Sequence, residues 1–175
     1  MPDDGKVSGL YERDFYEWSG AQARAIRAAQ VALSDSRVND VRASLSELDW
    51  ENLAEEIETL GRSDRQGLES RIATTIEHLL KLEFSPAADP RAGWEETVGR
   101  SRAEIAMLLR TSPSLQRLLP EIIDDRTESV RRIARRSLAH YGELAQAVSV
   151  GIAERRYTED QILGDWWPAP AGDST

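Results

Sequence analysis

Apolar residues recur at helical spacing along most of this chain, and proline and glycine interrupt them at only a few places. Spacings of three and four residues put apolar side chains on one side of an α-helix, whereas a half-buried strand would alternate apolar and polar residues. The pattern therefore predicts an all-α fold. With 175 residues and no long linker, the chain is expected to form a single-domain bundle of about five to six helices.

A helical hairpin is predicted over residues 49–84. Asp49 is placed to cap its first helix and Gly61 to end it, while Ser63 and Gln66 fit a capping box that begins the second helix. The apolar stripe of the first helix comprises Trp50, Leu53, Ala54, Ile57 and Leu60, and that of the second comprises Leu68, Ile72, Ile76, Leu79 and Leu80. Because the turn between them is short, the two helices are expected to pack side by side.

Other helix boundaries are indicated by capping residues and prolines. A first helix is expected over residues 10–33, and Asp89-Pro90 and Ser112-Pro113 each resemble an N-cap followed by proline at the first helical position. Pro120 either kinks its segment or opens the next helix. The expected organisation is a flexible segment at residues 1–9, a helical domain at residues 10–168 and a disordered tail at residues 169–175.

The C-terminal region carries a capping box and two tryptophans. Thr158 and Gln161 have the spacing that begins a helix, which we expect to be a single turn. Trp166 and Trp167 follow it, and their aromatic area is too large to be left in water. We therefore expect this tail to dock on the bundle.

Several blocks of this sequence resemble the bacterial DUF29 family. They are YERDFYEW at residues 11–18, LDWENLAEEIETLGRS at residues 48–63, Glu69-Ser70-Arg71, His78-Leu79-Leu80-Lys81, YTEDQIL at residues 157–163 and Trp167-Pro168. The similarity extends over nearly the whole chain, and a block as long as residues 48–63 rarely arises from amphipathicity alone. The resemblance implies an all-helical, mostly bacterial domain for which no activity, substrate or catalytic residue is established.

Charge and composition exclude several classes of function. The chain has 31 acidic and 22 basic residues and a formal net charge of −9, which disfavours general binding to nucleic acid. The lack of cysteine excludes disulfides, thiolate zinc sites and iron–sulfur clusters. The longest apolar run, Ile105–Leu109, is far shorter than the about 18 residues of a membrane span, and the first residues do not resemble a signal peptide. We therefore expect a cytoplasmic protein without membrane contact.

The predicted hairpin suggests one possible metal site. Glu55 and Glu58 on the first helix and His78 on the second could lie between the paired helices and serve a metal-assisted hydrolase or nuclease. We favour a simpler interpretation, because the glutamates lie opposite the apolar stripe, where carboxylates usually form a solvated face. Neither His78 nor His140 has a glutamate three positions earlier, as a di-iron bundle requires; those positions are Thr75 and Ser137. We therefore assign no catalytic residue, metal or cofactor, and an enzymatic role is not the favoured interpretation.

A cluster of arginines and the tryptophan tail are the best candidates for interaction. The cluster comprises Arg131, Arg132, Arg135 and Arg136, which repel one another at helical spacing unless an anionic group lies nearby. Three alternatives are open: an intramolecular ion-pair face that uses Glu128 or the acidic residues 47–58, a protein–protein interface, or a site for phosphate or nucleic acid. Trp166 and Trp167 could dock in their own chain or in a second copy, so a homodimer is possible.

The sequence favours a non-catalytic module for protein interaction or oligomerisation, because two unusual surface features accompany the lack of any recognisable catalytic motif. The identity of a partner or substrate, the oligomeric state and the biological process are not encoded in any pattern that we recognise.

Overall fold

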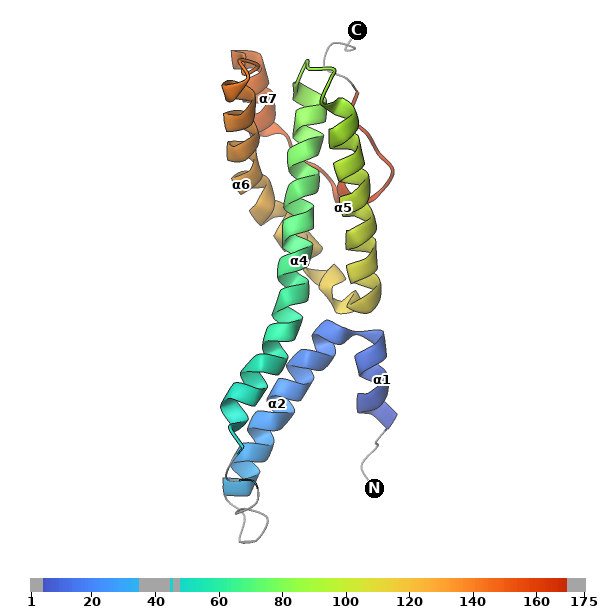
Figure 1. Cartoon of the computed structure of the whole chain (residues 1–175), viewed down its shortest axis with the longest axis vertical. Helices are drawn as coiled ribbons and strands as arrows, with labels where there is room; N and C mark the ends of the chain where they lie inside the picture. Colours follow the sequence, from blue (N-terminus) through green and yellow to red (C-terminus); the bar gives the residue numbers. More distant parts are fainter. Residues whose placement is uncertain (1–4, 35–44, 46–47, 170–175) are drawn as a thin grey trace. The chain divides into compact units, whose positions relative to one another are not determined.

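A computed structural model describes residues 5–34, 45 and 48–169 of the chain, and these residues confirm the all-α prediction (Figure 1). They contain seven α-helices, one short 3-10 helix and no strand. The elements are α1 (Gly5–Arg13), α2 (Phe15–Ser34), α4 (Trp50–Phe84), α5 (Arg91–Thr111), η1 (Pro113–Leu118), α6 (Leu119–His140), α7 (Gln146–Glu154) and α8 (Glu159–Leu163). None of the described helices is both long and apolar enough to span a membrane.

The structure describes the two ends of the chain only in part. Residues 5–9, predicted to be flexible, form most of α1, and residues 1–4 lie outside the described part of the chain. The expected disordered tail at residues 169–175 also falls outside it, apart from Ala169.

Contacts divide the chain into two compact units. The first comprises residues 1–66 and 109–115, and the second comprises residues 67–108 and 116–175. The sequence contains no linker between them, because the division passes through α4, α5 and η1.

The predicted hairpin at residues 49–84 is wrong, because α4 is one continuous helix from Trp50 to Phe84. Asp49 does cap it, accepting a hydrogen bond from the backbone amide of Asn52 at 3.2 Å. Gly61 does not end the helix. It is buried, and a Cβ atom built on it would overlap Oγ of Ser19 on α2. Its physical role is thus to let two helices approach closely, and the capping box at Ser63 is not used.

Small residues line the contact between α2 and the first half of α4. Ala23 and Ala54 are 1% and 0% exposed, whereas Leu53 and Leu60, which the stripe predicted to be inward, are 43% and 51% exposed. The buried face of this half of α4 is therefore shifted by about one residue: Ala54 and Gly61 point inward in place of Leu53 and Leu60. Arg27 on α2 crosses the edge of this contact and pairs with Glu51 and Glu58, each at 3.1 Å.

Asp14 divides the helix that was predicted over residues 10–33. Its carboxylate accepts a hydrogen bond from the backbone amide of Glu17 at 2.9 Å, which begins α2. The same carboxylate accepts from the amide and hydroxyl of Ser114 at 2.6 and 2.8 Å. Asp14 is only 9% exposed, and these hydrogen bonds replace those to water that its carboxylate loses on burial.

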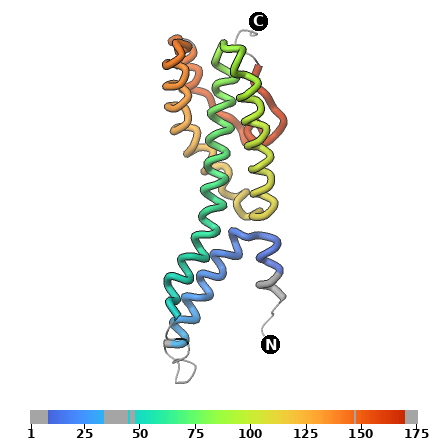
Figure 2. The backbone as a smooth tube through the Cα atoms, in the orientation of Figure 1, coloured from blue at the N-terminus to red at the C-terminus, as the bar shows by residue number. Residues whose placement is uncertain are grey.

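In the second unit, α5 and α6 lie against the second half of α4 (Figures 1 and 2). The ion pairs Arg71–Glu104 and Arg126–Glu69 join α4 to α5 and to α6, respectively. The predicted inward face of this half is confirmed, since all five of its residues are at most 1% exposed; they are Leu68, Ile72, Ile76, Leu79 and Leu80. Pro120 opens α6 rather than kinking it.

The helix α7 was not predicted. Its Gly151 packs against Phe84, and a Cβ atom at Gly151 would lie 2.6 Å from Cε1 of that ring. The predicted capping box at Thr158 is confirmed. The backbone amide of Gln161 donates to Oγ1 of Thr158 at 3.2 Å, and the backbone amide of Thr158 donates to Oε1 of Gln161 at 3.1 Å.

The close packing at Gly61 gives a stability prediction. Gly61→Ala should improve the intrinsic propensity of α4 but lower the free energy of unfolding by about 1–3 kcal/mol, because the new methyl group overlaps Ser19. Gly99→Ala on α5 is the matched control, since no atom lies within 4 Å of a Cβ atom there. It should raise stability by about 0.5–1 kcal/mol.

Chemical denaturation of the two variants measures this difference. Removing the hydroxyl with Ser19→Ala in the Gly61→Ala background should restore part of the loss. Equal stabilisation by both alanines would contradict the close contact.

Candidate interaction surface

One side of α6 is exposed and strongly charged. We call it the α6 charged face, and it consists of Asp124, Asp125, Glu128, Arg132, Arg135 and Arg136. The opposite side of the helix is buried in the second unit through residues that include Ile122, Val130, Ala134 and Leu138, none more than 2% exposed. The core thus determines which charges α6 presents to solvent.

Three of the four clustered arginines lie on this face. Within the part of the chain that the structure describes, Arg132, Arg135 and Arg136 have no ion-pair partner. Two of the acidic residues that could have complemented them, Glu51 and Glu58, pair with Arg27 instead.

Arg131 differs from its neighbours because it is buried, with 4% of its surface exposed. Its guanidinium donates a hydrogen bond to the backbone carbonyl of Arg155 and lies 3.4 Å from the carboxylate of Glu128. Arg131 therefore holds the segment after α7 and does not share the exposed face, contrary to the prediction that grouped all four arginines.

The C-terminal tail docks on its own chain, through Arg102 of α5. The guanidinium donates to the carbonyls of Gln161, Ile162 and Trp166 at 2.8, 3.0 and 2.7 Å. It also lies 4.8 Å from the centre of the Trp167 ring. Two of these carbonyls belong to the last turn of α8, where no helical donor remains. Trp166 is consequently half-buried, and Trp167 remains 42% exposed.

Glu83 of α4 fixes the segment before α8. Its carboxylate accepts from Nε of Arg155 at 2.9 Å and from the hydroxyl of Tyr157 at 2.7 Å. The Arg155 guanidinium lies 4.5 Å from the Tyr157 ring centre and 5.5 Å from that of Trp166. Burial, reinforced by the nearby carboxylate of Glu83, raises the pKa of Tyr157 well above its usual value.

The structure does not bring the candidate metal ligands together. Glu58 and His78 lie on the same continuous helix, not on two helices that pack against each other. Glu58 pairs with Arg27, and Nδ1 of His78 lies 2.9 Å from the carbonyl oxygen of Thr74. Among the described residues, no group of three or more histidine and acidic side chains, Glu55 included, is arranged to hold a metal ion.

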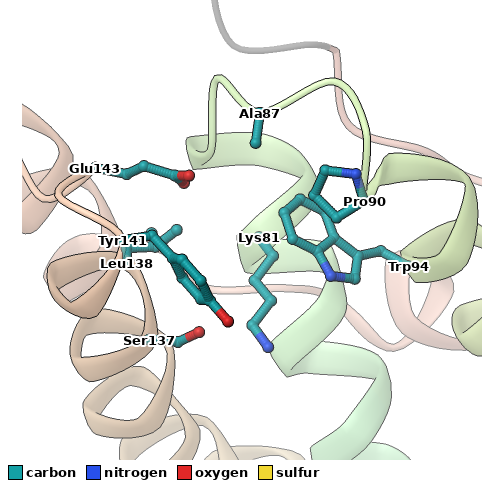
Figure 3. Close-up of a pocket in the computed structure, with 8 residues that line it drawn as sticks. All are labelled: Lys81, Ala87, Pro90, Trp94, Ser137, Leu138, Tyr141 and Glu143. Atoms are coloured by element: carbon teal, nitrogen blue, oxygen red, sulfur yellow. The ribbon is translucent and has the colours of Figure 1, made fainter.

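A cleft of about 370 Å³ opens between α4, α5 and the end of α6. Figure 3 shows Lys81 between Tyr141 and Trp94 in this cleft. Its charged groups already have partners, because Lys81 pairs with Glu77 at 2.6 Å and Glu143 accepts from Ser85 at 2.5 Å. The cleft therefore offers a ligand mainly apolar and aromatic walls.

Sequence reasoning did not identify Arg102 or Glu83 as anchors of the tail. Both lie on amphipathic helices among other charged residues, and their partners are about 60 to 74 residues away. No local pattern carries that information. Asp14 could have been recognised, since the acidic residue three positions later is typical of a capping box.

Together these features define an all-helical protein with one solvated, charged helix face and a tail fixed to its own core. The chain belongs to the DUF29 family, a domain of unknown function, whose model matches residues 10–167. No curated protein and no solved structure matches the chain. Membership thus confirms the resemblance seen in the sequence and carries no known activity.

The tail anchor can be tested at Arg102. Arg102→Ala should lower the free energy of unfolding by at least about 1.5 kcal/mol, because three carbonyls lose a charged donor. Tryptophan emission should shift to longer wavelength, and the tail should become sensitive to protease. Arg100→Ala is the control on the same helix, since its exposed pair with Glu96 should contribute less than about 1 kcal/mol. Equal effects of the two variants would contradict the anchor.

The buried hydroxyl of Tyr157 predicts a pH dependence. Its pKa is higher in the folded than in the unfolded chain, so folding favours the protonated form and stability falls as the pH rises above about 10. Tyr157→Phe should reduce this alkaline loss and cost about 1.5–3 kcal/mol at pH 7 through the lost bond to Glu83.

Thermal unfolding between pH 7 and 11 measures both effects. Tyr141→Phe is the matched control. Tyr141 is 72% exposed, so this substitution should change neither the alkaline loss of stability nor the stability at pH 7. A wild-type chain whose alkaline destabilisation is unaltered by Tyr157→Phe would contradict this assignment.

Proposed function

We propose that this protein is a non-catalytic interaction module and that the α6 charged face is its contact surface. The observation that carries the proposal is the set of three exposed arginines, Arg132, Arg135 and Arg136, which have no ion-pair partner among the described residues. Like charges three and four residues apart on a helix repel one another. A surface that keeps such a cluster unpaired gains from a partner that brings opposite charge.

Two of the other candidate contacts, Arg131 and Trp166, are already engaged within the chain. Arg131 donates to the carbonyl of Arg155, and the backbone of Trp166 accepts from Arg102. A partner that used them would have to displace these hydrogen bonds. The proposal therefore rests on α6, and it includes the cytoplasmic location expected from the sequence.

Binding experiments with charge-reversed full-length chains test this proposal. Chemical cross-linking and affinity capture from cells of the source organism should yield a complex with the wild type, including any complex of the chain with itself. The triple variant Arg132→Glu, Arg135→Glu, Arg136→Glu should lose that complex by about tenfold or more, since removing charged interface groups costs several kcal/mol in sum.

A second triple variant controls for net charge. Arg24→Glu, Arg100→Glu, Arg110→Glu changes three exposed arginines on other helices by the same amount and should bind normally. Equal binding by both triple variants, or no complex with the wild type, would overturn the proposal.

A further inference from the structure

Six of the charged residues on α6, those of the α6 charged face, are arranged antisymmetrically about Val130. Three carboxylates of this face precede Val130, and its three arginines follow at matching separations. In order outward from Val130, the matched residues are Glu128 and Arg132, Asp125 and Arg135, and Asp124 and Arg136. Each carboxylate is as far before Val130 as its matched arginine is after it.

All six charged residues lie on the same side of the helix. At 100° per residue they fall within about 60° of the direction opposite Val130. Val130 is itself 2% exposed, and all six are exposed, so this direction faces solvent. The side chain of Glu128 is 74% exposed even though it lies near Arg131.

Within one molecule this segregation places more like charges than opposite charges one turn apart, Glu128 and Arg132 being the opposite pair. Asp124 and Glu128 are one turn apart, as are Arg132 and Arg136, and like charges at that spacing destabilise a helix. The helix macrodipole favours acidic residues in the first turn and basic residues in the last, but its effect falls off beyond those turns. All six residues lie between the first and the last turn of α6 and therefore gain little from the macrodipole.

We propose that the α6 charged face binds the same face of a second copy of this chain, with the two helices antiparallel and a two-fold axis opposite Val130. This inference rests on the proposed function and names its partner. In this arrangement each residue lies level with the residue of the second copy that is equally far from Val130 on the other side. Every carboxylate of the face then meets an arginine of the second copy, and symmetry doubles the three pairs.

The charges also select the orientation of the two helices. A parallel, in-register pair would bring each residue opposite itself, so arginines would face arginines and carboxylates would face carboxylates. Only the antiparallel pair turns the repulsion within one helix into attraction between two. Exposed ion pairs are individually weak, so the dimer is a reversible complex that salt disrupts.

Sedimentation of the full-length chain tests the self-association. At protein concentrations up to about 0.5 mM the wild type should dimerise in about 0.05 M salt and dissociate in about 1 M salt. An acidic variant, Arg132→Glu, Arg135→Glu, Arg136→Glu, and a basic variant, Asp124→Arg, Asp125→Arg, Glu128→Arg, should each be monomeric. An equimolar mixture of the two should restore the dimer, because each face then meets its opposite.

The orientation has an independent test that keeps all six charges. The chain contains no cysteine, so Ala139→Cys accepts a single nitroxide label. Residue 139 and its counterpart in the antiparallel pair are separated along the axis by about 27 Å, so the spin–spin distance should be about 30 Å. A parallel pair would give a distance near that between helix axes. Circular dichroism verifies that each variant is folded, and the labelled chain decides the question should a charge variant misfold.

The outcomes separate this inference from the proposed function. A wild type that stays monomeric in low salt, or a mixture that does not dimerise, overturns the self-pairing. If the acidic variant nevertheless loses a different captured partner, the interaction face stands with another occupant. If neither self-association nor any captured complex depends on the arginines, both proposals fail.

Discussion

The packing of one continuous helix, α4, underlies both compact units of this protein. Its first half carries Ala54 and Gly61 at the contact with α2, and its second half carries large aliphatic residues that lie at the core of the second unit. Small residues let backbones approach, while large ones fill the space between helices that lie farther apart. The difference in residue size along one helix therefore determines two different kinds of packing.

Arginine has two contrasting roles in the second unit, and burial separates them. Arg131 and Arg102 are removed from water to different extents, and both donate to backbone carbonyls of the C-terminal segment. A guanidinium taken from water needs acceptors of this kind, and carbonyls at the end of a helix need donors. Arg132 and Arg136 keep their hydration and remain available to a partner. Adjacent positions in the cluster thus differ: Arg131 is part of the buried structure, and Arg132 belongs to the exposed face proposed for interaction.

Much of the fold could be predicted from local chemistry. The caps at Asp49 and Thr158 depend on residues within one turn of each other, and both are confirmed. Of the two alternatives that the sequence left open at Pro120, the structure shows that it begins α6. The failures have a different origin. Gly61 has the residue type of a helix stop, but its meaning depends on Ser19, which lies 42 positions earlier in the chain. The helix α7 is short and rich in small residues, so its own sequence gives a weak helical signal. Its contact with Phe84, a residue distant in sequence, holds it in place.

The sequence by itself determined the helical class, several helix boundaries and the order of acidic and basic residues along α6, because these follow from periodicity, from contacts within a turn and from the residues themselves. Only the tertiary structure decided that Arg131 is buried while Arg132, Arg135 and Arg136 are exposed, and that Glu58 and His78 lie on one continuous helix. Such outcomes depend on which helix covers which face. That choice is made by the fit of side chains distant in sequence, and no local pattern encodes it.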